Sequence, residues 1–199
     1  MKLRTLCLLL GAGLLAGCWQ KSLNAFYTPG DVIPDEKLVG TWHEKKESAG
    51  EKGQVWTFIS GEDKSYKLEI KNEDESHHYE AHLFKLDGHR LLDIMPTERT
   101  VSTIPAHNLF RVTEIGTNLQ VACLNIDWMQ KWLRKNPSSL PHVAIIDPEN
   151  RDDREKDELV LIADTKALQT FLGQHWNDSD LFAGTVAFES KRDQTAAKK

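Results

Sequence analysis

Apolar and polar residues alternate along much of the chain between residues 54 and 124, with the period of two that is typical of β-strands. In residues 65–71, for example, Tyr66, Leu68 and Ile70 fall on one side of an extended chain and charged residues fall on the other. The pattern predicts strands over residues 54–60, 65–71, 78–86, 90–95, 109–115 and 119–124.

Turn signals separate these segments. Asp87-Gly88 is a hairpin pair, and residues 116–118 are a second hairpin candidate. Short strands that follow one another in this way predict an antiparallel meander, folded as a sandwich or a barrel. A closed sheet has no exposed edges, and the number of strands favours an up-and-down β-barrel.

The pattern changes after residue 124. Residues 125–135 have helical spacing, with Trp128 and Trp132 four positions apart. A second helix is predicted over residues 166–175, with Asp164 or Thr165 as its N-cap. Strands are predicted over residues 158–163 and 181–188, and the charged stretch 142–156 is predicted to be an exposed loop.

The N-terminus has the layout of a secretory signal. Lys2 and Arg4 precede an apolar run of about 10 residues, well short of the roughly 20 that span a bilayer as a helix. The stretch 15–18, Leu-Ala-Gly-Cys, resembles a bacterial lipobox, in which the cysteine becomes the acylated first residue of the mature protein. An ordinary signal peptide with a chance cysteine is the alternative. The lipobox implies lipidation at Cys18 by chains such as palmitate, and a protein held at a membrane.

This signal sets the predicted division of the chain. Residues 1–17 are the signal peptide, 18–36 are the lipidated cysteine and an irregular tether, 37–190 are one barrel domain, and 191–199 are a disordered tail. Trp19 follows the cysteine. By resemblance to Gram-negative lipoproteins, a residue other than aspartate at this position implies the outer membrane.

The net charge and the cysteine content limit which binding partners and disulfides can be expected for this chain. The formal net charge is −5, and a net acidic chain is poorly suited to neutralising nucleic-acid phosphates. Cys7 leaves with the signal and Cys18 is acylated, so Cys123 has no partner for an internal disulfide. We expect Cys123 to be a small buried apolar residue.

Gly40-Thr41-Trp42, at the start of the ordered domain, resembles the Gly-x-Trp signature of lipocalins. More broadly, the strings LFKLDGHRLLDIMP, IPAHNLFRV, LNIDWMQKWL and LVLIADTKALQTFL are similar to lipocalin-like bacterial lipoproteins of unassigned activity. The resemblance covers most of the chain from Leu38 onward and implies an eight-stranded barrel whose base Trp42 closes. The helix inserted at 125–135 departs from an ordinary lipocalin.

Four aromatic residues are candidates for a ligand-binding wall: Trp42, Trp56, Phe58 and Tyr66. Small barrels either fill with side chains or enclose one ligand. The same residues are therefore either the lining of an apolar cavity or ordinary core.

A row of His78, Glu80 and His82 is the one candidate metal site, because residues two apart on a strand face the same way. Two histidines and a carboxylate are a known ligand set for zinc or iron. Such neighbours lie about 6.6–7 Å apart, however, and a solvated polar face is the alternative interpretation. Asp93 and His107 are a further candidate pair, able to orient a group or to satisfy polar atoms at the barrel rim.

No cofactor is predicted, and the common enzyme motifs are absent from the sequence. The leading hypothesis is therefore a non-enzymatic envelope lipoprotein that binds a small apolar or amphipathic molecule in its barrel. The second is a filled barrel that docks another envelope protein through Trp128, Met129 and Trp132, since aromatic residues and methionine are enriched at interfaces. The third is a metal-dependent enzyme that uses the row of His78, Glu80 and His82.

Overall fold

The structure is a computed structural model that describes residues 19–46, 51–73, 75–98, 105–146 and 157–190. The predicted signal peptide, Cys18 and the predicted tail lie outside these residues. The strands are β1 (Lys21–Ser22), β2 (Gly40–Glu44), β3 (Val55–Ser60), β4 (Tyr66–Lys71), β5 (Ser76–Leu86), β6 (His89–Pro96), β7 (His107–Ile115), β8 (Asn118–Leu124), β9 (His142–Ile145), β10 (Glu158–Leu161) and β11 (Phe182–Ser190). The helices are the short 3-10 helix η1 (Glu36–Leu38), α1 (Ile126–Lys135) and α2 (Thr165–His175).

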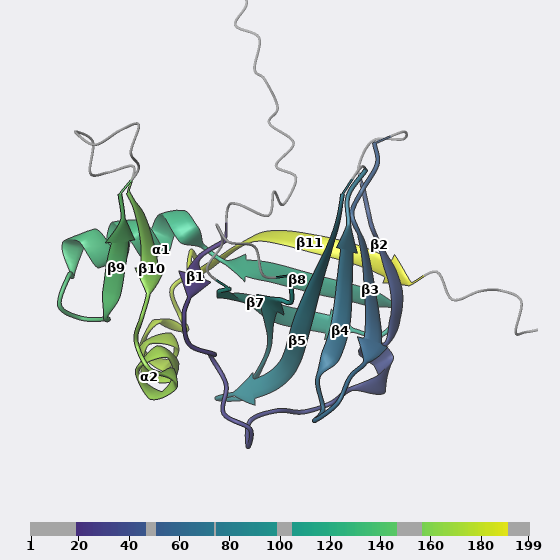
Figure 1. The fold of residues 1–199 in the computed structure, drawn as a ribbon, viewed down its shortest axis with the longest axis horizontal. Helices are drawn as coiled ribbons and strands as arrows, with labels where there is room; N and C mark the ends of the chain where they lie inside the picture. The colour runs from purple at the N-terminus through teal and green to yellow at the C-terminus, as the bar shows by residue number, and fades with distance from the viewer. Residues whose placement is uncertain (1–18, 47–50, 74, 99–104, 147–156, 191–199) are drawn as a thin grey trace, which may run out of the picture.

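Eight of these strands form a closed antiparallel barrel (Figure 1). Their order is β6-β5-β4-β3-β2-β11-β8-β7, and pairing between β6 and β7 closes the ring. The predicted mainly β architecture with an antiparallel barrel and two α-helices is therefore confirmed. Each strand predicted between residues 54 and 124 is present, with its ends shifted by a few residues.

Local sequence explains both the strands and the turns. In β4, Tyr66, Leu68 and Ile70 are buried, and the intervening side chains are exposed or half-buried. At the hairpin between β5 and β6, Asp87 and Gly88 have φ angles of 48° and 87°. Positive φ at both central residues gives a turn whose twist matches that of the paired strands, which is why this dipeptide favours a hairpin.

Aromatic and aliphatic side chains from the inner faces of the strands form the barrel core. Leu38 of η1 is completely buried in this core, and the Nε1 of Trp42 donates a hydrogen bond of 2.8 Å to the Leu38 carbonyl. The tryptophan of the Gly-x-Trp stretch thus ties η1 to the barrel.

A second hydrophobic core lies outside the barrel. It joins the outer wall, through residues such as Leu109 and Leu124, to β10 and to both helices. Strands β1, β10 and β9 extend the sheet beyond β7 as a side sheet, seen at the left of Figure 1. Asn125 caps α1 by accepting hydrogen bonds from two backbone N–H groups of the first turn, and Asp164 caps α2 by accepting one. Neither of these helices, nor any other in the described ranges, has the length and apolarity needed to cross a bilayer.

Two predictions about irregular segments are wrong. The predicted tether contains β1, and Trp19, Phe26 and Val32 are buried at 4%, 1% and 7% exposure. These three residues of the arm, residues 19–36, pack on the barrel in spite of the prolines that suggested a tether. The predicted loop over 142–156 begins with strand β9, which pairs antiparallel with β10; residues 147–156 lie outside the described residues.

Candidate functional site

The four predicted ligand-binding residues all lie in the barrel core. Trp42, Trp56, Phe58 and Tyr66 are at most 2% exposed. The rings of Phe58 and Tyr66 meet edge to face, with centroids 6.1 Å apart. The Tyr66 hydroxyl accepts a hydrogen bond of 2.7 Å from the Asp35 N–H, and burial raises the pKa of this hydroxyl.

Aromatic rings make contact across the middle of the barrel. Strands β3 and β7 lie on opposite sides of the ring of eight, since three strands separate them in either direction. Trp56 of β3 nevertheless packs edge to face on Phe110 of β7, with centroids 5.6 Å apart. Trp56 also contacts Phe188 of β11 at 5.0 Å. At this level side chains fill the barrel, as they do in many small barrels.

Trp19 of the N-terminal arm adds another ring to the same core. Its indole packs edge to face on Phe110 at 5.1 Å and lies 6.3 Å from the ring of Tyr79. The Nε1 of Trp19 is buried and has no hydrogen-bond partner among the described residues. Sequence reasoning treated Trp19 only as a sorting residue, so it missed this contribution to the core.

The predicted metal row is on one face of β5 but does not form a metal site. His78 and Glu80 are exposed, and His82 is half-buried on the same outer face. The Nδ1 of His82 turns away to the hydroxyl of Tyr27, at 2.8 Å. Within the described ranges, no group of three or more His, Cys, Asp or Glu side chains is placed to hold a metal ion. Alternate residues of a strand start about 6.6–7 Å apart. His82 and Glu80 do approach one another, at 3.6 Å, but no third ligand among the described residues joins them.

Asp93 and His107, the second candidate pair, are in contact. The His107 Nδ1 lies 2.7 Å from the Asp93 Oδ1. The Asp93 Oδ2 accepts a hydrogen bond of 3.0 Å from the Phe26 N–H. Asp93 is 1% exposed. Its two contacts join β6 to β7 and to the N-terminal arm. This arrangement satisfies buried polar groups and fastens the arm to the barrel.

Tyr27 and His82 lie beside that pair. Their rings stack with centroids 4.5 Å apart. Burial, with the negative charges of Asp93 and Glu80, raises the pKa of Tyr27 to about 12. Tyr27 therefore keeps its proton, and its hydroxyl is hydrogen-bonded to the Nδ1 of His82 at 2.8 Å. The other ring nitrogen of His82 faces Glu80 at 3.6 Å.

A groove lies between α1 and α2. Its volume is about 440 Å³, within the range of roughly 300–1,000 Å³ that is usual for small-molecule sites. Its lining includes the apolar residues Trp132, Leu140 and Phe171, and the polar residues Asp164, Lys166 and Gln174. We call this the α1–α2 groove.

Stacked aromatic rings form one side of the α1–α2 groove. Trp132 meets Phe171 edge to face at 4.8 Å and His175 at 4.9 Å. Trp128 lies parallel to Trp132 within 15°, with centroids 6.3 Å apart. Both tryptophans remain partly exposed, whereas Met129 points into the second core and is completely buried. The predicted docking patch therefore keeps its two tryptophans and loses its methionine.

The i, i+4 spacing of the tryptophans was visible in the sequence. Their partner Phe171 belongs to the predicted apolar stripe of the second helix, but no local pattern places one helix against the other.

Comparison with known protein families, with curated proteins and with solved structures gives no match for this chain.

Proposed function

We propose that this protein is a non-enzymatic lipoprotein of the cell envelope, held at the membrane by acyl chains on Cys18. In this proposal the barrel is a filled scaffold, and a small amphipathic molecule binds in the α1–α2 groove. The lipobox at residues 15–18 supports the anchor. Trp19, which is not an aspartate, favours the outer membrane if the cell is Gram-negative.

The observation that carries the proposal is the contrast between the two aromatic clusters. In the barrel, Trp56 and Phe110 contact one another across the interior, so a ligand at that level would have to displace packed rings. In the α1–α2 groove, Trp132 and Phe171 border open volume. Ligand sites are typically apolar surfaces with a few polar groups, and the groove has both.

The chemistry of the groove favours an amphipathic ligand. A flat apolar part would pack on the rings of Trp132 and Phe171, where aromatic contacts contribute about 0.5–1.5 kcal/mol beyond buried area. A polar part would remain at the rim, near Lys166 and Gln174.

Titration with 1-anilinonaphthalene-8-sulfonate, a fluorescent amphipathic anion, tests this proposal. We expect saturable binding to the folded protein, weakened about tenfold by Trp132→Ala, a loss of about 1.4 kcal/mol. Val39→Ala is the matched control, because Val39 is an apolar side chain, 41% exposed, between η1 and β2, and does not line the α1–α2 groove. Circular dichroism verifies that both variants are folded. Equal binding by the wild-type protein and Trp132→Ala would contradict the proposal.

A further inference from the structure

Strand β10 of the side sheet turns one row of side chains into the second core and the alternate row to the outer face. In the register of β10 with β9, Leu159 pairs with Ala144 and Val160 pairs with Val143. Directly paired residues point to the same side of a sheet. Leu159 and Leu161 belong to the second core, so Val160 and Val143 lie on the opposite face.

Five apolar residues share this outer face: Leu23, Val143, Ile145, Val160 and Ile162. Four of them are substantially exposed, Leu23 at 41%, Val143 at 42%, Ile145 at 43% and Ile162 at 39%, whereas Val160 is buried, at 3%. We call this set the apolar face. Contiguous exposed apolar surface of this kind marks a site of protein or membrane contact.

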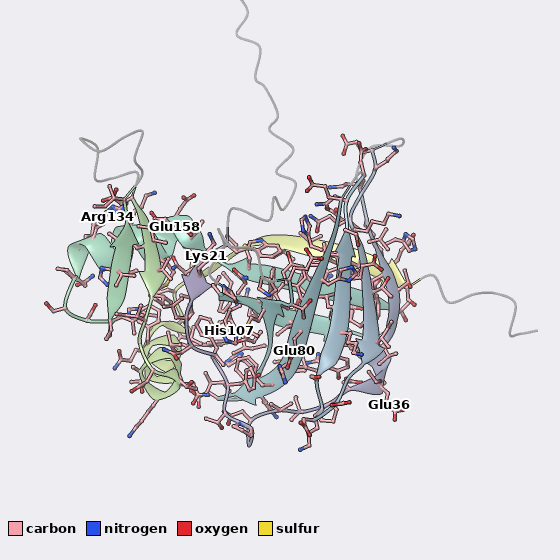
Figure 2. The ribbon with its side chains drawn as sticks, in the orientation of Figure 1. Lys21, Glu36, Glu80, His107, Arg134 and Glu158 are labelled. Carbon is pink, nitrogen blue, oxygen red and sulfur yellow. The ribbon has the colours of Figure 1, made fainter. Side chains whose placement is uncertain are left out.

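The charges on the apolar face compensate one another. Lys21 and Glu158 lie on the same side as Val160, and their Nζ and Oε1 atoms are 3.0 Å apart. Figure 2 shows the two side chains close together where β1 and β10 begin. An ion pair at this place leaves no net charge from these two residues to oppose contact with an apolar phase.

The apolar face lies close in sequence to residue 18, the proposed site of the acyl anchor. Only Trp19 and Gln20 separate Cys18 from β1, and both are buried, at 4% and 1% exposure. Leu23 is five residues from Cys18, at most about 18 Å along an extended chain. An acyl anchor on Cys18, as proposed above, would therefore be joined to the side sheet through two buried residues and would hold the side sheet at the bilayer.

From this placement we infer that the apolar face lies on the lipid surface and fixes the orientation of the barrel at the membrane. The inference rests on the proposed acyl anchor at Cys18. Side chains of a membrane-contacting face insert about 5–10 Å into the boundary between headgroups and acyl chains. Leu23, Val143, Ile145 and Ile162 are the side chains assigned to this contact.

The test uses the full, acylated protein in vesicles of phosphatidylethanolamine and phosphatidylglycerol. Cys123→Ser leaves an introduced cysteine as the one reactive thiol, because the Cys18 sulfur carries lipid. An environment-sensitive fluorophore is placed on Val143→Cys, and on Ile59→Cys as the matched control. Both positions are exposed, at 42% and 58%, so both labels are compatible with the fold.

We expect lipids that carry a quencher near the headgroup to reduce the fluorescence at position 143 about twofold, because that side chain reaches the boundary region. The label at position 59 should be unaffected. Equal quenching at both positions would overturn the inference. So would the absence of quenching at position 143 in acylated protein that floats with the vesicles. Neither result would contradict the acyl anchor. In a third outcome, the label at position 143 is shielded from aqueous iodide in native membranes but is not quenched by the lipids in vesicles. This result would assign the apolar face to a protein partner and would also overturn the inference.

The intact mass of the same sample separates the two proposals. If the mass shows no acyl chains, and differs from that of a Cys18→Ser variant only by the substitution, the anchor and this inference are both overturned.

Discussion

Individual aromatic residues in this protein have different roles according to what surrounds them. Trp42 donates a hydrogen bond to Leu38 and Trp56 donates one to Gln54, so both indoles are satisfied inside the barrel. Trp19 shares that core without a partner for its Nε1 among the described residues. Trp132 borders open volume. Residue type alone therefore does not separate core from site, and the four aromatic candidates chosen from the sequence all lie in the core.

His82 makes stability depend on pH. Burial lowers the pKa of His82 below its ordinary value of 6.5, and Glu80 and Asp93 only partly oppose this effect. Below pH 6.5 the unfolded chain therefore takes up a proton that the folded protein does not, and the free energy of unfolding falls as the pH falls. We expect a smaller loss between about pH 7.5 and about pH 5 in His82→Gln than in the wild-type protein.

Urea unfolding at the two pH values measures the effect. His89 also has a lowered pKa, through burial and the charge of Arg111, so some dependence should remain in the variant. An unchanged loss of stability in His82→Gln would show that His82 does not contribute.

The N-terminal arm is the element that the sequence describes least well. Its prolines and glycine suggested a tether, yet Phe26 is buried against the barrel and its N–H is bound by Asp93. The contact joins residues 67 positions apart, and local pattern carries no information about such pairs. Strand β4 shows the opposite case, since its alternation is a local pattern and its prediction is confirmed.

Loss of the Asp93 carboxylate should loosen the arm. Asp93→Ala leaves the Phe26 N–H without its acceptor and removes the partner of His107. We expect a loss of about 3 kcal/mol in the free energy of unfolding. The matched control is Glu62→Ala, which removes an exposed carboxylate from a turn. Urea denaturation compares the two variants, and a similar small change in both would refute the role assigned to Asp93.

At the scale of the whole molecule, the described residues form two separate hydrophobic cores. The barrel core is assembled from strands whose period of two is visible in the sequence, which is why the barrel was predictable. The second core joins α1, α2 and the side sheet to the outer wall. The candidate site and the apolar face both depend on this second assembly. Sequence pattern predicts each helix there but not how the helices, β9 and the N-terminal arm meet, because these contacts are long-range.

The central claim is that a small amphipathic molecule binds outside a filled barrel, and native mass spectrometry of residues 19–199 exported from their own cell tests it most directly. The account predicts a retained adduct of a few hundred daltons on the wild-type protein and its loss in Trp132→Ala. An adduct that persists in Trp132→Ala would place the ligand elsewhere, and a bare wild-type mass would contradict small-molecule binding.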